Sequence, residues 1–278
     1  MNNERSGSAD RYAVFGHPIG HSKSPRIHTL FAQQTDQSID YQAQDVPPES
    51  FTAAVEHFFA SGGKGLNCTV PLKEPAFQLA TQKSARARYA GAINTLWLDA
   101  NNVLSGDNTD GAGLLRDLTT NLQLDLRDKR LLILGAGGAS RGILLPLLQQ
   151  NPSSLIIANR TIEKAHTLAK HFADFGTVET CSFDALAGQH FDLILNATSA
   201  SLSGDLPPLP AGLLADGGGC YDLAYGMQPT AFVRWGLANG AAFSKDGLGM
   251  LVEQAAEAFH IWRGVRPYTR PVIDILEH

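Results

Sequence analysis

The chain has 278 residues, enough for one large domain or two medium ones. Hydrophobic residues make up 44% and charged residues 18%, and the net charge is −5. This is an ordinary globular balance without the strong positive charge of a nucleic-acid or anionic-membrane surface.

No apolar run reaches the ~18 residues that cross a bilayer, and the polar residues 1–11 lack the apolar stretch of a secretory signal, which predicts a frayed tail. Cys68, Cys181 and Cys220 are odd in number and show no paired spacing, which indicates reduced thiols and no zinc site. We expect a soluble cytoplasmic protein without a metal, and an enzyme is the class that fits best.

The first predicted elements are a strand at 12–15 and a loop at 16–24 rich in Gly, His, Ser and Pro. A helix then follows, with Ser24 as its N-cap and Pro25 at its first position. Two hydroxyls, those of Ser22 and Ser24, beside a helix N-terminus suit a bound carboxylate. Ordinary capping by Ser24 is the alternative, and it explains only one of the two serines.

A further strand is predicted at 66–70. Side chains alternate along a strand, so Asn67 and Thr69 point one way and Cys68 and Val70 the other. Two neighbouring polar groups on one face indicate a binding surface, whereas Cys68 is interpreted as a core thiol.

Lys73 follows this strand by a few residues, and a lone lysine is usually a solvated surface residue. A candidate partner is Asp110 in the segment 107–111, which comes after another predicted strand at 92–98. A Lys and an Asp that hydrogen-bond in a semi-enclosed cleft can relay a proton to or from a substrate hydroxyl. The alternative for this segment is a helix N-cap.

The central region predicts a parallel, doubly wound sheet. Short apolar runs at 131–134, 155–158 and 191–195 alternate with helical patterns, as in βαβ units. The third run ends in Asn196-Ala197-Thr198-Ser199.

Gly135, Gly137 and the small Ser140 follow the first of these strands and match the dinucleotide pattern G-x-G-x-x-small. The first glycine permits a tight turn, the second admits the pyrophosphate, and the helix N-terminus offers free N–H groups. A plain tight turn is the alternative, but the surrounding strands and helix favour a cofactor site. The predicted cofactor-binding loop is Gly135, Ala136, Gly137, Gly138 and Ala139.

The end of the second strand selects the cofactor. An NAD site usually carries an acidic residue there, whereas this chain has Asn159-Arg160-Thr161. A guanidinium pairs with a 2′-phosphate that a carboxylate would repel. NADP(H) is therefore favoured over NAD(H), with a solvated arginine as the alternative.

Near the end of the chain, Leu251, Ala255, Ala258, Phe259 and Trp262 form an amphipathic helical stripe. We expect this helix to pack on the first domain, with a cleft between the domains. The predicted domains are 1–110, joined by 251–278, for substrate binding and catalysis, and 111–250, a Rossmann-type domain for NADP.

Seven motifs in order make the chain, from about Tyr12 to its end, resemble the shikimate dehydrogenase family. They are Gly16–Pro25, Asn67–Glu74, Gly91–Thr95, Asn108–Gly111, Gly135–Arg141, Asn159–Thr161 and Asp246–Leu251. The resemblance implies NADPH-dependent, reversible reduction of 3-dehydroshikimate to shikimate, a step of chorismate and aromatic amino-acid biosynthesis.

The resemblance also implies residue roles. Ser22 and Ser24 hold the substrate carboxylate, and Tyr225 lies near the carboxylate and the nicotinamide. The residues that hydrogen-bond the ring hydroxyls are Asn67, Lys73, Thr69, Asn94, Asp110 and Gln254. The glycine loop takes the pyrophosphate, Thr198 lies in the cofactor site, and Asn159, Arg160 and Thr161 take the 2′-phosphate, while Gly247 and Met250 flank the nicotinamide.

Lys73 then donates the proton or stabilises the developing negative charge, and Asp110 orients it. The chain departs from the family at Leu72, where many relatives have His; this side chain is expected to point away from Lys73. The spacing around Tyr225, before Pro229 and Thr230, also differs from the family's.

Three alternatives remain. A broader quinate/shikimate dehydrogenase that uses NAD keeps the fold, although Arg160 disfavours NAD. Proteins like glutamyl-tRNA reductase or methylenetetrahydrofolate dehydrogenase leave the Ser-Lys-Ser and Asn-Cys-Thr motifs unexplained. A non-catalytic NADP(H)-binding sensor is disfavoured because Lys73 and Asp110 are both kept. A homodimer is compatible with the sequence, which leaves the oligomeric state open.

Overall fold

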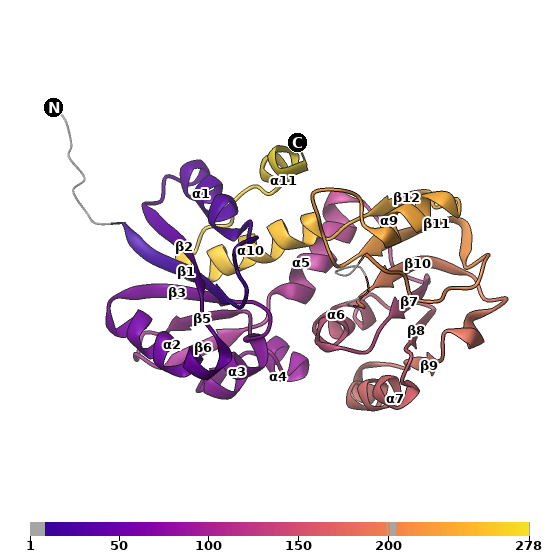
Figure 1. Cartoon of the computed structure of the whole chain (residues 1–278), viewed down its shortest axis with the longest axis horizontal. Helices are drawn as coiled ribbons and strands as arrows, with labels where there is room; N and C mark the ends of the chain where they lie inside the picture. The colour runs from indigo at the N-terminus through magenta and orange to yellow at the C-terminus, as the bar shows by residue number, and fades with distance from the viewer. Residues whose placement is uncertain (1–8, 199, 201–203, 278) are drawn as a thin grey trace. The chain divides into compact units, whose positions relative to one another are not determined.

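The computed structural model describes residues 9–198, 200 and 204–277, and by their internal packing these residues form two compact units. Unit 1 comprises the chain up to Thr109 together with 255–276, and unit 2 comprises 110–254 (Figure 1). Of the tail predicted at 1–11, residues 1–8 lie outside the described part of the chain. Asp10 and Arg11 already belong to the first strand, so that part of the prediction is wrong.

Unit 1 is built on a mixed sheet, which within the described residues has six strands in the order β2-β1-β3-β5-β6-β4. Pairs β1–β2, β1–β3 and β4–β6 are parallel, whereas β3–β5 and β5–β6 are antiparallel. The strands are β1 (Asp10–Gly16), β2 (Ile39–Asp45), β3 (Gly63–Cys68), β4 (Gln82–Lys83), β5 (Thr95–Leu98) and β6 (Leu104–Asp107). The helices are α1 (Ser24–Gln34), the 3-10 turn η1 (Pro48–Ser50), α2 (Phe51–Ala60), α3 (Lys73–Leu79), α4 (Ala85–Ala90) and α11 (Arg270–Glu277).

Alternation along β1 produces the two faces of this sheet. Ala13 and Phe15 point into a core that includes residues of α2, α3 and α4, whereas Tyr12 and Val14 point to the opposite face, where Trp262 packs. In Figure 1, α2, α3 and α4 accordingly lie on one side of the sheet and α1 on the other.

Two local predictions in unit 1 are wrong. Strand β3 ends at Cys68 rather than Val70, because a turn closed by Leu72 N–H to the Thr69 carbonyl follows, and Val70 is 69% exposed. Helix α1 already includes Ser24, so Ser24 is not its N-cap; instead the hydroxyl of Ser22 accepts the Ser24 N–H at 3.3 Å.

Unit 2 contains the predicted doubly wound parallel sheet. Its described strands run β12-β11-β10-β7-β8-β9, all paired in parallel. They are β7 (Arg130–Leu134), β8 (Ser154–Ala158), β9 (Glu179–Cys181), β10 (Phe191–Asn196), β11 (Leu214–Asp222) and β12 (Phe243–Lys245). The helices are α5 (Asp110–Arg116), the π-helical turn η2 (Asp117–Asn121), α6 (Gly138–Leu148), α7 (Ile162–His171), the 3-10 turns η3 (Ala173–Phe175) and η4 (Asp184–Leu186), and α9 (Ala231–Ala238).

Buried apolar runs make the strands of unit 2. Leu132 and Leu134 share one core with Phe232 of α9, and alternation directs the equally buried Leu131 and Ile133 to the other face. A sheet covered on both faces requires such continuous apolar strands, which is why sequence patterns located them.

The amphipathic stripe near the end of the chain forms α10 (Leu248–Arg263). Its residues from Ala255 onward belong to unit 1, where Phe259 and Trp262 pack near His28, so the predicted packing on the first domain is confirmed.

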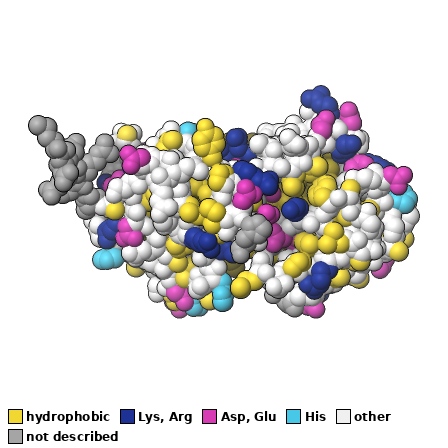
Figure 2. Space-filling view, turned by 90° about the horizontal axis from the view of Figure 1, so that it is seen from above, with side chains coloured by type: hydrophobic (Ala, Val, Ile, Leu, Met, Phe, Trp, Pro, Cys, Tyr) yellow, Lys and Arg dark blue, Asp and Glu magenta, His cyan; other side chains and the backbone are white. Residues whose placement is uncertain are grey.

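Within the residues that the structure describes, no helix combines the length and apolar composition that crossing a membrane requires. On the face in Figure 2, basic and acidic side chains are interspersed.

Candidate active site

The start of α1 offers an anion-binding group in unit 1. Ser24 is buried and Ser22 is half-buried, and the helix has no side-chain cap at its N-terminus. At this helix start the Ser24 N–H bonds to the Ser22 hydroxyl, Pro25 has no N–H, and the Ile27 N–H bonds to the Lys23 carbonyl. The Arg26 N–H and the two serine hydroxyls are the groups that can bind an anion here, at the positive end of the helix dipole. This arrangement fits a carboxylate.

Asn67 lies at the centre of a buried hydrogen-bond network. Its Nδ2 group donates to the Asn94 carbonyl at 2.9 Å and to Thr95 Oγ1 at 3.1 Å, and its Oδ1 accepts the Tyr41 hydroxyl at 2.7 Å. Both amide protons are therefore used, and a lone pair on Oδ1 remains. A ligand hydroxyl would have to donate to Asn67 rather than accept from it.

Asn94 is tied to the segment that leads to Asp110. Its Oδ1 accepts the Thr109 N–H at 2.9 Å, and its Nδ2 donates to Thr109 Oγ1 at 2.9 Å. Asn94 is buried, so besides its predicted role in substrate binding it fixes the backbone of this segment.

An ion-pair network, which sequence reasoning missed, supports the same segment. Arg86 on α4 pairs with Asp107 at the end of β6 and with Glu257 on α10, and Arg266 also pairs with Glu257. Burial alone would raise the pKa of Glu257, but the two arginines lower it below its usual value. Asp107 additionally accepts the Asn108 N–H at 2.7 Å, so its carboxylate holds the turn before Asp110.

Lys73 and Asp110 each open a helix. Lys73 is the first residue of α3 in unit 1, and Asp110 is the first residue of α5 in unit 2. Both are half-exposed. Leu72, immediately before Lys73, is fully buried in the core beneath β1. Thr69 is half-exposed in the turn that carries Lys73, and its N–H donates to the Phe15 carbonyl.

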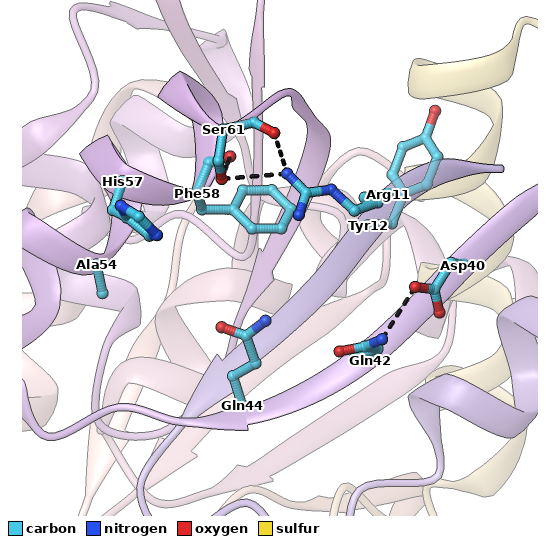
Figure 3. A pocket seen from close by; sticks show the side chains of 9 residues that line it. All are labelled: Arg11, Tyr12, Asp40, Gln42, Gln44, Ala54, His57, Phe58 and Ser61. Atoms are coloured by element: carbon cyan, nitrogen blue, oxygen red, sulfur yellow. Dashed lines mark hydrogen bonds between the residues drawn. The ribbon is translucent and has the colours of Figure 1, made fainter. Parts of the chain in front are cut away.

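The thiol of Cys68 is confirmed as a core group: it is 2% exposed, and burial raises its pKa well above the ordinary value. All three cysteines are free. A separate surface pocket beside β1, β2 and α2 contains none of the predicted site residues; in it Arg11 donates to the carbonyl and hydroxyl of Ser61 (Figure 3).

The glycine loop of unit 2 has the geometry of a phosphate cradle. Gly135 has a φ of +100°, which favours glycine, and a Cβ there would lie 3.1 Å from Thr198 Cγ2. A Cβ on Gly137 or Gly138 would meet nothing within 4 Å, so this side of the loop is open. Ser140 donates to the Gly135 carbonyl at 2.7 Å and closes the turn.

Helix α6 begins at Gly138 and has no side-chain cap, so its first N–H groups are available to an anion. Ala136 and Ala139 complete the loop. Open space over the glycines and a helix N-terminus fit the pyrophosphate of a dinucleotide.

The segment after β8 fits a 2′-phosphate. Asn159 Nδ2 donates to the Thr161 carbonyl at 2.7 Å, which closes a tight turn. Arg160 is exposed and makes no ion pair with the part of the chain that the structure describes, so its guanidinium is free for a ligand.

The remaining predicted residues of unit 2 follow the ends of β10, β11 and β12 or lie on α10. Thr198 donates to Asn196 Oδ1 at 2.7 Å, and Tyr225 is half-buried, with its pKa raised by burial and by Asp246. Gly247 is held against the Leu223 carbonyl, which a Cβ would approach to 2.3 Å. On α10, the Met250 N–H donates to the Tyr221 hydroxyl, and the Gln254 amide donates to the Leu251 carbonyl.

Sequence reasoning missed Tyr41, Arg86 and Tyr221, each of which holds a predicted site residue or the backbone beside one. An aromatic or arginine residue inside a strand or helix carries no local signal of such a role, because its partner lies far along the chain.

Three family models match the chain. Residues 14–96 match the shikimate dehydrogenase substrate binding domain, residues 117–203 match shikimate/quinate 5-dehydrogenase, and residues 247–277 match the shikimate 5′-dehydrogenase C-terminal domain. Together they cover more than half of the chain.

Individual proteins are similar over nearly the full length. The shikimate dehydrogenase (NADP(+)) of Methylococcus capsulatus is 64% identical over 96% of both chains. A crystal structure of an enzyme from Pseudomonas putida is 50% identical with a TM-score of 0.92, covering 97% of this chain and 99% of its own. The shikimate 5-dehydrogenase of Thermus thermophilus, solved with NADP(H) and shikimate, is 32% identical with a TM-score of 0.84, covering 95% of this chain and 97% of its own.

Proposed function

The chain belongs to the shikimate dehydrogenase family, and on that premise we propose that it catalyses the reversible, NADP-dependent reduction of 3-dehydroshikimate to shikimate, a step of aromatic amino-acid biosynthesis. It is an NADP-dependent oxidoreductase of the α/β class. The observation that carries this proposal is the identity of 64% with an NADP-dependent relative over nearly the whole length of both chains.

We assign substrate binding to unit 1. Ser22 and Ser24 bind the ring carboxylate at the start of α1, where the helix dipole and the two hydroxyls favour an anion. Asn67 Oδ1 accepts a hydrogen bond from a ring hydroxyl, because the amide protons of Asn67 are already bonded. Thr69, Asn94 and Gln254 complete the polar lining, and Tyr225 lies near the carboxylate.

We assign cofactor binding to unit 2. The pyrophosphate lies on the open side of Gly137 and Gly138, at the N-terminus of α6, next to Thr198. Asn159, Arg160 and Thr161 bind the 2′-phosphate, which explains the preference for NADP(H). Gly247 and Met250 lie against the nicotinamide, and the bound cofactor supplies the hydride for reduction.

Lys73 and Asp110 act as the proton-transferring pair. During reduction the substrate carbonyl gains a hydride at carbon, and its oxygen becomes alkoxide-like and needs a proton. Lys73 Nζ donates that proton or stabilises the negative charge, and the Asp110 carboxylate orients the ammonium group and binds the neighbouring hydroxyl. Acid–base assistance of this kind typically contributes ~10²–10⁴ in rate.

Further assignments follow from the proposed function. The reaction takes place in the cytoplasm, consistent with three free cysteines, two of them buried. A homodimer would leave this mechanism unchanged, because every group that it uses comes from one chain.

The test is the nicotinamide absorbance of purified protein with shikimate or quinate and with NADP⁺ or NAD⁺, in all four combinations. We expect rapid reduction of the cofactor only in the combination of shikimate with NADP⁺. Comparable rates with quinate or NAD⁺ would assign the protein to a broader quinate/shikimate dehydrogenase. No reduction in any combination, with NADPH still bound, would contradict the proposed reaction and favour a sensor.

A further inference from the structure

Gly247 and Met250 are the proposed neighbours of the nicotinamide: Gly247 immediately precedes α10 and Met250 lies in its first turn. A buried phenol from another element caps this turn. Tyr221 on β11 is fully buried, and its hydroxyl accepts the Met250 N–H at 3.2 Å. Asp246 Oδ1 accepts the Leu248 N–H at 3.1 Å. Two N–H groups that a helix start leaves unpaired are therefore bonded to side chains.

The same phenol is bonded to a buried carboxylate. The Tyr221 hydroxyl donates to Asp117 Oδ2 at 2.7 Å, and Asp117 is only 4% exposed. Because the hydroxyl both donates and accepts, it links the carboxylate to the backbone of α10, and its rotation about the C–O bond is fixed from both sides.

Asp117 also lies directly against the helix backbone. A Cβ added to Gly249 would come within 2.2–2.3 Å of the Asp117 carboxyl atoms, so only glycine allows this approach. Burial raises the pKa of Asp117, and the hydrogen bonds from Asn121 and Tyr221 oppose that rise. The position of this turn is thus set by contact as well as by hydrogen bonding.

A second carboxylate extends the network by one helical turn. Asn121 donates to Asp117 Oδ1 at 2.8 Å and to Glu253 Oε1 at 3.0 Å, and Glu253 is fully buried beside Arg116. Asp117 and Asn121 are the first and last residues of the π-helical turn η2, an irregular element that is frequent at functional sites. Nothing in the proposed chemistry of Lys73 and Asp110 uses these groups.

We propose that Tyr221 and Asp117 are positioning residues, which hold the first turn of α10 where it supports the nicotinamide ring for hydride transfer. This inference rests on the proposed function, since that function places the nicotinamide at Gly247 and Met250. The pair acts on the geometry of transfer and not on cofactor affinity, because the phosphate groups bind at α6 and after β8.

The test is Tyr221→Phe, which removes one hydroxyl and keeps the ring. The fluorescence of bound NADPH should change, because the surroundings of the ring change, while the Kd for NADPH stays within about threefold of the wild-type value. Turnover should fall on the order of 10- to 100-fold, since small displacements of reacting groups have such effects. The primary deuterium isotope effect on kcat should rise.

Asp117→Asn is the conservative variant. It keeps an acceptor for the Tyr221 hydroxyl and should retain most of the turnover that Tyr221→Phe loses. Leu186→Ala is the matched control: it truncates a buried residue of unit 2 in the core shared by Leu132 and Phe232. It should lower the melting temperature and leave the fluorescence of bound NADPH and the isotope effect unchanged.

Tyr221→Phe with a lowered melting temperature but wild-type turnover, isotope effect and bound-NADPH fluorescence would overturn the inference. If Tyr221→Phe does not fold, Asp117→Leu takes its place. Unchanged bound-NADPH fluorescence and turnover in Asp117→Leu would then overturn the inference. Wild-type protein that binds NADPH but does not reduce NADP⁺ with shikimate would contradict the proposed function instead. In that case unchanged bound-NADPH fluorescence in Tyr221→Phe would still show that Tyr221 does not position the turn beside the nicotinamide.

Discussion

The phenol of Tyr41 on β2 donates a hydrogen bond of 2.7 Å to the amide oxygen of Asn67 on β3. Strand β1 lies between the two strands, so the bond crosses β1. It fixes which edge of the Asn67 amide faces the proposed substrate, because the amide protons bond to Asn94 and Thr95 on the other side.

Tyr41→Phe should therefore loosen the Asn67 amide. We expect the KM for shikimate to rise about fivefold, equivalent to one hydrogen bond of about 1 kcal/mol, with a smaller change in kcat. Steady-state kinetics measure this, and Tyr12→Phe is the control, since Tyr12 lies in the same core and bonds to Arg263 instead. Equal KM values in both variants would show that the Tyr41 hydroxyl does not position Asn67.

His28 predicts an acid-sensitive fold. Burial lowers its pKa to about 3, it is fully buried against Tyr41, and neither ring nitrogen has a hydrogen-bond partner among the described residues. The unfolded chain takes up a proton near pH 6.5 that the folded chain does not. The free energy of unfolding should therefore fall by about 1.4 kcal/mol per pH unit from pH 6.5 toward pH 3.

His28→Phe should remove this contribution. Between pH 7.5 and pH 5 the wild-type protein should lose about 2 kcal/mol more than the variant, as measured by urea unfolding. His57→Gln, at an exposed position, is the control and should keep the wild-type slope. Parallel pH profiles for wild type and His28→Phe would contradict the prediction.

Gly137→Ala separates the fold from cofactor binding. An added Cβ meets no protein atom within 4 Å and φ is −93°, so the melting temperature should not change. If the pyrophosphate lies against this glycine, the Kd for NADPH should rise at least tenfold by fluorescence titration. Gly20→Ala in unit 1, also in open space, should leave the Kd unchanged; a similar Kd in both variants would place the phosphates elsewhere.

Arg160→Gln should reduce the preference for NADP⁺. Hydrogen bonds to a charged group contribute about 1.5–3 kcal/mol, so the KM for NADP⁺ should rise about 10- to 100-fold while that for NAD⁺ changes little. Arg127→Gln, another exposed arginine of unit 2, serves as the control. An unaltered ratio of the two KM values would mean that Arg160 is a solvated residue.

Lys73→Ala should lower kcat by about 10²–10⁴ with little change in shikimate affinity, because the lysine acts on the developing negative charge. Single-turnover absorbance and a separate binding titration distinguish the two effects. Lys64→Ala, which changes an exposed lysine of the same unit, is the control and should leave kcat unchanged. Unchanged turnover in Lys73→Ala would remove Lys73 from the mechanism.

The sequence by itself determined the elements whose signals are local. The buried strands β7, β8 and β10 follow from apolar runs, and the glycine loop before α6 follows from the spacing of Gly135 and Gly137. Such patterns succeed because side-chain periodicity and turn geometry depend on residues only a few positions apart.

Local reasoning was wrong where neighbouring structure decides an end of an element. The strand predicted through Val70 stops at Cys68, because Thr69 bonds back to Phe15 and the chain then turns at Leu72. Polar alternation continues through this turn in the sequence, so the pattern alone does not mark where the strand ends.

Only the tertiary structure decided which side chains support the site. Tyr41 reaches Asn67 across 26 positions, Tyr221 reaches Asp117 across 104, and Arg86 reaches Glu257 across 171. No spacing rule connects residues so far apart, because their approach depends on the packing of whole strands and helices. The chemistry of the motifs is therefore readable in the sequence, whereas their orientation is a property of the folded chain.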